Sequence, residues 1–162
     1  MAAIKGFAWA LSKPVVEVPT LDTLARNIFL IPDPASRGLV VPVIDAKRNL
    51  IYTAFYKIDK SGLKRITPFM LLNQTEFLAK LKSKTLRKGC VIFGDALNVH
   101  RQVMQAGIRG ACFLDKDHYV LSPGNLLTLG RELIKDKKIT NPFDIEPIYL
   151  YPKECQIKGK HK

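Results

Sequence analysis

The residues of this chain best suited to chemistry lie in one short segment, VIDAKRNLIYTAFYKID, at positions 43–59. Its pattern indicates a strand, a tight turn and a second strand. The turn holds one acid, Asp45, which is followed closely by the bases Lys47 and Arg48. Such a turn either cradles a phosphate or is a plain corner of a sheet, where an aspartate carboxylate accepts hydrogen bonds from its own backbone. In the second case we expect Lys47 and Arg48 to be solvated or to face an acidic partner.

Other reactive residues do not gather into a recognisable site. The three histidines fall on a predicted helix, in a loop and in the tail, so we expect surface or boundary positions for His100, His118 and His161. The three cysteines lack a C-x-x-C pair, and buried, reduced thiols are the expectation for them. Hydrolase, nucleotide-triphosphatase and zinc-protease motifs are absent from the sequence. We therefore predict no catalytic residue, no metal site and no cofactor.

Charge points to a polyanionic partner. The formal net charge is +12, and a field of this sign attracts nucleic acid first and anionic membranes second. Five bases and no acid occupy KLKSKTLRK at 80–88, and the last ten residues are again rich in lysine. No RNA-module signature or aromatic stacking platform accompanies them, so contact would be with phosphates. The candidate contacts are Lys80, Lys82, Lys84, Arg87, Lys88, Lys158, Lys160 and Lys162.

The elements that must position these residues alternate between strands and helices. The segment at 43–59, with a third strand near 63–69, predicts a three-stranded antiparallel meander. Downstream, Asn73 and Glu76 form a capping-box signature for one helix, and Ser122 with Pro123 opens another. Short strands are predicted at 14–18, 90–94, 111–114 and 146–152, and helices at 2–11, 20–30 with Thr20 as N-cap, 95–107 and 122–138. The helix that the capping box opens carries Phe77, Leu78 and Leu81. The fold class is therefore α/β with a mixed sheet. No apolar run is long enough to span a membrane, and we expect a cytoplasmic protein.

The first predicted helix is apolar nearly all round. Ile4, Phe7 and Leu11 form one stripe, the opposite side is small and uncharged, and Lys5 is the one charged side chain before Lys13. A helix of this kind must be covered on both sides. It is either a plain core helix of a larger protein or an interface that also allows self-association. The expected interface residues are Ala3, Gly6, Phe7, Trp9 and Ala10.

Three segments together resemble a known family. KGFAWALSKPVVEVPTLDTLA, VIDAKRNLIYTAFYKID and EPIYLYPKECQIK are similar, in order and spacing, to segments of the TsaB family, formerly YeaZ. That family belongs to the superfamily of actin, sugar kinases and Hsp70. The resemblance implies the second lobe of such a protein, with the first lobe missing before Met1. It also implies a division into connecting elements at 1–37, the lobe at 38–152 and a basic tail at 153–162.

The resemblance also implies a function. TsaB relatives are non-catalytic scaffold subunits of the machinery that adds threonylcarbamoyl to the adenosine next to the anticodon of tRNA, supporting the catalytic subunit TsaD, with the ATPase TsaE joining the assembly. In the superfamily, Asp45 would mark the phosphate loop and Gly94 the adenosine turn, and both patterns are degenerate because neighbouring glycines are missing. The basic candidates above would then contact tRNA. The alternatives are a phosphate-contacting RNA-binding module and a degenerate kinase.

Overall fold

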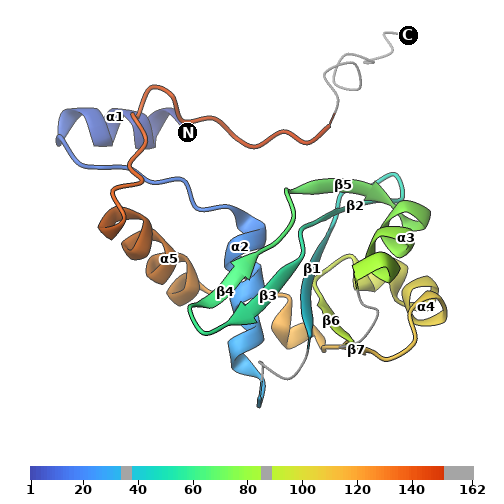
Figure 1. Cartoon of the computed structure of the whole chain (residues 1–162). Helices are drawn as coiled ribbons and strands as arrows, with labels where there is room; N and C mark the ends of the chain where they lie inside the picture. Colours follow the sequence, from blue (N-terminus) through green and yellow to red (C-terminus); the bar gives the residue numbers. More distant parts are fainter. Residues whose placement is uncertain (34–37, 85–88, 152–162) are drawn as a thin grey trace, which may run out of the picture.

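A mixed sheet built around strand β1 organises the chain, and the computed structural model describes residues 1–33, 38–84 and 89–151 of it (Figure 1). β1 pairs antiparallel with β2 and β3 on one side and parallel with β6 on the other, and β7 follows β6 in parallel. The strands are β1 (Leu39–Asp45), β2 (Leu50–Thr53), β3 (Tyr56–Asp59), β4 (Gly62–Arg65), β5 (Met70–Asn73), β6 (Cys90–Phe93) and β7 (Ala111–Phe113). The helices are α1 (Ala2–Ala10), α2 (Thr20–Ala25), α3 (Gln74–Lys84), α4 (Leu97–Gly107) and α5 (Pro123–Lys135), with short 3-10 helices η1 (Arg26–Leu30) and η3 (Lys116–His118). The predicted α/β class is confirmed.

The antiparallel meander is present, with two of its three strands interrupted. β2 and β3 keep one register against β1, because Val43 lies opposite Thr53 and Leu39 lies opposite Lys57. β4 pairs antiparallel with β3, and β5 pairs antiparallel with β2, so that β4 and β5 together form the third strand. This third strand has extra residues at the interruption, and the Phe55 N–H there donates to Thr67 Oγ1 at 2.9 Å. A bulge of this kind bends a strand without ending its pairing.

The central strands are buried on both faces, as expected where helices cover a parallel pair. Successive residues of β1 alternate between two cores: Val41 and Val43 face one, and Val40 faces the other. Helices α3 and α4 close the first core, to which they contribute Phe77 and Met104. Helix α2 closes the second core on the opposite face.

Two predicted N-caps are confirmed and one is wrong. At α3, the Glu76 N–H donates to Asn73 Oδ1 at 2.9 Å and the Asn73 N–H to Glu76 Oε2 at 3.0 Å, so the capping box is complete. Ser122 caps α5, accepting from the Asn125 N–H at 3.4 Å. Thr20 is not an N-cap: Pro19 holds that position and Thr20 is the first helical residue.

Two predicted strands are wrong. Residues 14–18 are extended but form a single antiparallel bridge, between Val15 and Thr140. Residues 146–151 form no strand, and position 152 lies outside the described residues. Both segments carry prolines at or beside their ends, and a proline has no N–H to offer a neighbouring strand. Tyr151 nevertheless docks on the sheet, because its hydroxyl donates to the Ala46 carbonyl and its ring meets Tyr52 edge-on.

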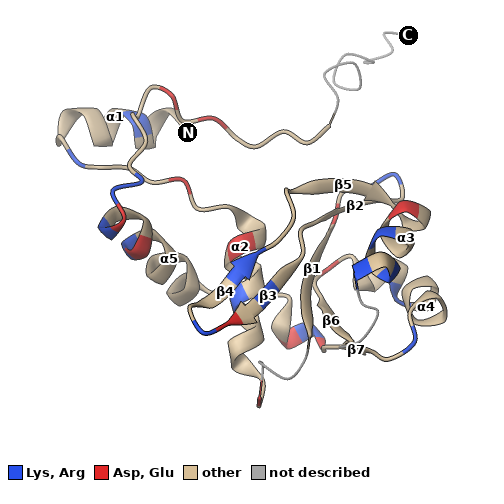
Figure 2. Ribbon diagram, viewed as in Figure 1, with Lys and Arg blue, Asp and Glu red and all other residues tan. Residues whose placement is uncertain are grey.

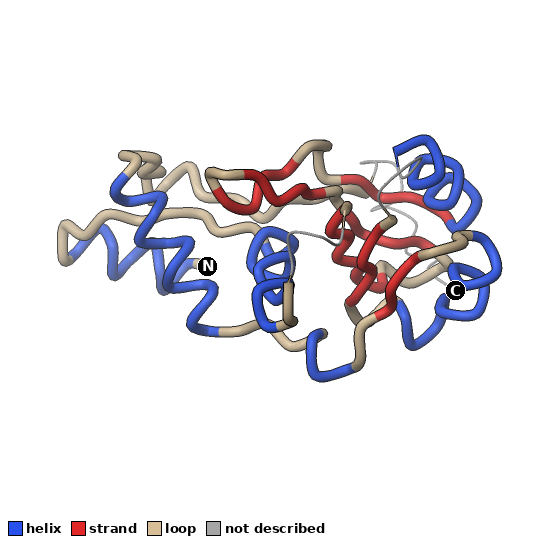
Figure 3. The backbone as a smooth tube through the Cα atoms, turned by 60° about the horizontal axis from the view of Figure 1, so that its bottom comes forward, coloured by secondary structure: helices blue, strands red, loops and turns tan. Residues whose placement is uncertain are grey.

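Helices α1 and α5 lie together at one end of the molecule, away from α3 and α4 (Figures 1 and 3). Ala8 is the buried side chain of α1, and no residue of α5 is fully buried. The Lys5 ammonium donates to the Phe143 carbonyl at 2.9 Å and holds α1 against the segment that follows α5. Within the described ranges, no helix is long and apolar enough to cross a membrane.

Candidate functional site

In the turn between β1 and β2, both oxygens of the Asp45 carboxylate accept hydrogen bonds from Lys47. Asp45 Oδ1 accepts from the Lys47 N–H at 2.8 Å, and Oδ2 lies 2.7 Å from the Lys47 ammonium. These two hydrogen bonds, the side-chain one first, lower the pKa of Asp45 below its ordinary value. The Lys47 side chain is otherwise 82% exposed. The geometry is that of an aspartate turn, the second of the two alternatives that the sequence offered, and neither carboxylate oxygen is left without a partner.

The backbone of this turn adopts an unusual conformation. Although the turn contains no glycine, Lys47, Arg48 and Asn49 have positive φ, of 64°, 52° and 59°. Left-handed residues with a Cβ cost roughly 1–2 kcal/mol each, and asparagine tolerates the region best. The turn therefore stores strain, which the ladder on either side and the Asp45 hydrogen bonds hold in place.

The need for a glycine at position 94 is explained by its close packing against β1. Its φ is +132°, and a Cβ added there would lie 2.0 Å from the Val43 carbonyl oxygen of β1. The next residue, Asp95, turns its carboxylate back to the hairpin, and its Oδ1 accepts from the Asp45 N–H at 2.9 Å. Gly94 and Asp45 are thus brought close together through Asp95. The space that this glycine provides is filled by β1.

Of the two histidines that the structure describes, His100 is the one whose expected position is wrong. It is fully buried on α4 and is not a surface or boundary residue. Gln74 Nε2 lies 2.5 Å from His100 Nδ1, and the other ring nitrogen has no hydrogen-bond partner among the described residues. A signal was available, since His100 shares with Leu97 and Met104 the spacing of a buried helical face. His118 is half-buried, in keeping with a boundary position, and position 161 lies outside the described residues.

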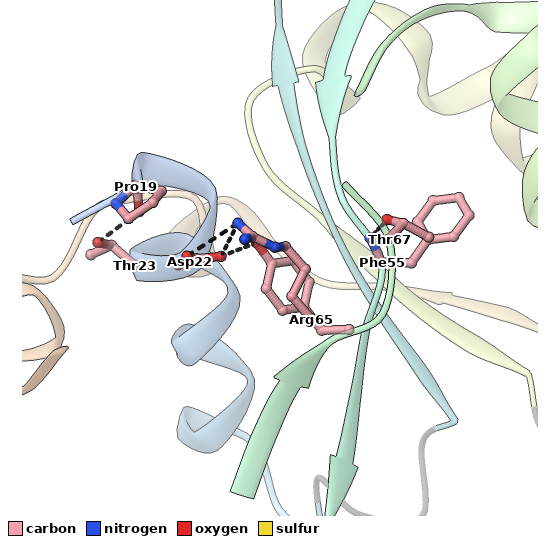
Figure 4. Close-up of polar contacts among 7 residues, drawn as sticks. Pro19, Asp22, Thr23, Phe55, Arg65 and Thr67 are labelled. Atoms are coloured by element: carbon pink, nitrogen blue, oxygen red, sulfur yellow. Dashed lines mark hydrogen bonds and ion pairs between the residues drawn. The ribbon is translucent and has the colours of Figure 1, made fainter. Parts of the chain in front are cut away.

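A polar cluster that the sequence analysis missed joins α2 to the sheet (Figure 4). The Tyr56 hydroxyl donates to Asp22 Oδ1 at 2.6 Å, and Arg65 Nη1 lies 3.3 Å from the same oxygen. Burial, reinforced by the Asp22 charge, raises the pKa of Tyr56 far above its ordinary value. The Arg65 guanidinium also stacks 3.8 Å from the Phe69 ring centroid. The arrangement fastens a helix to β3 and β4, and a buried tyrosine that stays protonated suits that structural role.

Metal and thiol chemistry find no support in the part of the chain that the structure describes. No group of three or more His, Cys, Asp or Glu side chains is placed there to hold a metal ion. Cys90 is buried, and burial raises the pKa of its thiol to about 11, so it is unreactive at neutral pH. Cys112 is half-buried.

The predicted interface residues of α1 are exposed. Phe7 and Trp9 are 67% and 69% exposed, and Ala3, Gly6 and Ala10 are exposed beside them. Helices α1 and α5, which lie together, and the chain just after α5 carry further exposed apolar side chains. We call this set of residues the apolar end; it comprises Ile4, Phe7, Trp9, Leu11, Leu126, Leu127, Ile134, Ile139 and Phe143.

The predicted phosphate contacts are only partly covered by the structure. Lys80, Lys82 and Lys84 are exposed on α3 (Figure 2). The remaining candidates, Arg87, Lys88, Lys158, Lys160 and Lys162, lie outside the described residues.

Comparisons with known proteins agree with this fold. A family model described as "TsaD: tRNA N6-adenosine threonylcarbamoyltransferase" matches residues 1–121. A protein of Bacillus subtilis (strain 168), described as "tRNA threonylcarbamoyladenosine biosynthesis protein TsaB", is 28% identical over 156 residues. That match covers 95% of this chain and 63% of the relative.

Two solved structures from Pseudomonas aeruginosa share the fold. One is described as an uncharacterized protein with similarity to peptidase YEAZ, with a TM-score of 0.74 and 18% identity over 93% of this chain. The other, YeaZ, has a TM-score of 0.69 and 18% identity over 92% of this chain. Each match covers 65% of the solved chain. The chain thus spans less than two thirds of the length of the relatives it matches.

Proposed function

The chain belongs to the TsaD (tRNA N6-adenosine threonylcarbamoyltransferase) family, in its TsaB (YeaZ) branch, and we propose that it is a non-catalytic subunit of the machinery that adds threonylcarbamoyl to tRNA. In this proposal a separate TsaD-like subunit performs the transfer. This chain binds that subunit, and a TsaE-like ATPase joins the assembly in the cytoplasm. The division at residues 37/38 and 152/153 is part of the same proposal.

The observation that carries the proposal is the apolar end. Burying one large apolar side chain is worth about 1.5–3 kcal/mol, and Phe7 and Trp9 leave most of that contribution unused in the chain alone. Exposed large apolar side chains gathered on neighbouring helices are typical of protein interaction sites. The chain's family is that of the TsaD threonylcarbamoyltransferase, and an enzyme of this type is the partner that we propose for the apolar end.

The occupied carboxylate of Asp45 supports the non-catalytic part of the proposal. A kinase-like role would need this group free to approach a nucleotide's phosphates or their metal. Both of its oxygens are instead engaged by Lys47. We expect no ATP hydrolysis above background from the purified chain. A stoichiometric ATP complex that Asp45→Ala abolishes would favour a kinase-like enzyme and contradict the proposal.

Co-purification with a TsaD-type subunit tests the partner. The unmodified chain should bind it and gain melting temperature, because a ligand that binds only the folded state stabilises it. Without partner, the chain should self-associate through α1. Phe7→Asp with Trp9→Ser should make the chain monomeric and remove both the complex and the thermal shift.

A matched control separates a docking surface from general surface polarity. Val99 and Val120 are 63% and 68% exposed and lie outside α1 and α5. Val99→Asp with Val120→Ser should leave the complex and the thermal shift intact. If the α1 variant still binds the subunit as tightly as the unmodified chain, α1 is not the interface. If the unmodified chain binds no TsaD-type subunit, the proposed function is wrong.

A further inference from the structure

Two lysines of the β3–β4 hairpin stand side by side on an open part of the sheet. Lys57 and Lys64 are directly opposite in the ladder, and Lys57 is also opposite Leu39 of β1. Directly opposed side chains lie on the same face of a sheet. Leu39 belongs to the core that α3 and α4 close, so both lysines project on that face. Both are exposed, which means that neither helix extends over this corner.

Helix α3 carries two more lysines on the same face of the sheet. Phe77 and Leu81 anchor α3 to the sheet, and Leu78 packs toward α4, where a Cβ on Gly107 would come 2.7 Å from it. At 100° per residue, Lys80 and Lys84 then lie on the flank of α3 that faces away from α4.

The strand order shows where that flank points. From one edge of the sheet to the other, the order is the β4–β5 strand, the β2–β3 strand, β1, β6 and β7. Helix α4 lies over β1 and α3 lies over β2 and β5, so the side of α3 away from α4 is the β4–β5 edge. Lys80 and Lys84 therefore project toward the edge that carries Lys57 and Lys64. By the same spacing Lys82 lies on the α4 side. We call Lys57, Lys64, Lys80 and Lys84 the basic shelf; its elements carry much of the blue in Figure 2.

The chain does not neutralise this charge itself. Within the described residues, no shelf ammonium group makes a hydrogen bond or an ion pair. The acids nearby are committed elsewhere: the Asp59 carboxylate is held by Ser61, and Glu76 caps α3. The pKa of Asp59 is lowered mainly by its hydrogen bonds from Ser61 and further by the charges of Lys64 and Lys57, so the shelf does act on this carboxylate. Like charges directly opposed on a sheet destabilise it, so an anion bound between them would relieve a cost that the free chain carries.

We propose that the basic shelf binds the phosphate backbone of RNA. Several cations along a helix and a neighbouring hairpin suit a chain of phosphates better than one isolated anion, and the net charge of +12 steers a polyanion toward the molecule. Contact is with the backbone and carries no base sequence, because no aromatic stacking platform accompanies the lysines. The inference rests on the proposed function for the identity of the RNA, a tRNA. It replaces Lys82 with Lys57 and Lys64 in the predicted contact set.

The test measures binding of unfractionated tRNA to the full chain over a range of salt concentrations. The logarithm of the affinity should fall linearly with the logarithm of salt concentration. Lys57→Ala with Lys64→Ala should reduce that slope by about 1.4 to 1.8, since each lost phosphate contact removes roughly 0.7–0.9. The same should hold for Lys80→Ala with Lys84→Ala, and the four changes together should remove about twice as much.

The matched control is Lys82→Ala with Lys135→Ala, which removes the same charge from the α4 side of α3 and from the end of α5. Its slope should match that of the unmodified chain. Equal slopes for the shelf and control variants would overturn the proposal. So would the absence of tRNA binding at low salt, or shelf-dependent binding to phosphatidylserine vesicles without binding to tRNA. If the unmodified chain forms the TsaD-type complex but binds no tRNA, this inference alone is overturned. If it binds tRNA through the shelf but binds no TsaD-type subunit, the proposed function alone is overturned.

Discussion

Large apolar side chains are buried in the sheet but exposed in the apolar end. In the sheet, Phe55, Phe77 and Phe93 are fully buried between strands and the helices that cover both faces. In the apolar end, Phe7 and Trp9 are more than two thirds exposed although the helix that carries them is fully formed. The same residue types thus stabilise the fold in one region and remain available for binding in the other.

This contrast shows where the chain's stability and its interaction surface reside. Burial drives folding in proportion to the apolar area removed from water, so the sheet with α2, α3 and α4 carries most of the free energy of unfolding. Helix α1 has few buried contacts and opens at low cost on its own. A partner that covers it adds stability that the isolated chain lacks.

The largest expected effect compares two phenylalanines. Phe77→Ala should lower the free energy of unfolding by about 3–5 kcal/mol, because it removes a buried ring and leaves a cavity. Phe7→Ala should change it by less than about 0.5 kcal/mol, as expected for an exposed position. Urea unfolding followed by circular dichroism measures both. Equal losses would mean that α1 is an ordinary core helix and would remove the contrast.

Two glycines should respond with opposite signs. Gly94→Ala places a Cβ 2.0 Å from the Val43 carbonyl at positive φ, so it should cost well over about 1 kcal/mol. Gly6→Ala on α1 meets nothing within 4 Å and should add about 0.5–1 kcal/mol of helix stability. Thermal unfolding monitored by circular dichroism compares the two variants with the unmodified chain. A stabilised Gly94→Ala would show that β1 and β6 do not approach as closely as described.

The two helix caps should differ in strength. Asn73→Ala removes the acceptor of a 2.9 Å hydrogen bond in a reciprocal cap on α3 and should cost about 1 kcal/mol. Ser122→Ala removes a 3.4 Å bond on α5, whose side chains are not fully buried, and should cost less. The free energy of unfolding in urea decides the order. A larger loss for Ser122→Ala would show that α5 contributes more to the folded state than its burial indicates.

The sequence predicted the features that depend on residues close together in the chain. The capping box at Asn73, the cap at Ser122 and the buried strand at 90–93 all follow from residue types within a few positions of one another, and the structure confirms them. The meander was predictable in the same way, because its pairing follows from the alternation of one continuous segment.

Features that depend on contacts between residues far apart in the chain could not be predicted from the sequence. Residues 14–18 and 146–151 have the composition of strands, but whether they pair depends on what lies beside them, and proline leaves each with fewer N–H donors. The burial of His100 depends on Gln74 of a different helix. The link between Asp22 and Arg65 likewise joins segments that only the fold brings together. The interface role of α1 remains a prediction, since exposure shows that a surface is available and not what covers it.

The smallest expected effect is a pH dependence at the turn between β1 and β2. Because the pKa of folded Asp45 lies below its ordinary value of 3.8, ionised Asp45 stabilises the folded state above that pH. This contribution is lost as the pH falls through the lowered folded value. The unmodified chain should therefore be slightly more stable than Asp45→Asn at neutral pH and should lose that advantage in acid. Urea unfolding at pH 7 and near pH 3 measures the difference. Lys47→Met should shrink the pH dependence, since Lys47 supplies the hydrogen bonds that lower the pKa, and only its backbone N–H would remain. If the difference in free energy of unfolding between the unmodified chain and Asp45→Asn is the same at pH 7 and near pH 3, the Asp45 carboxylate is not held by Lys47 in solution. The strained residues 47–49 would then need another source of support.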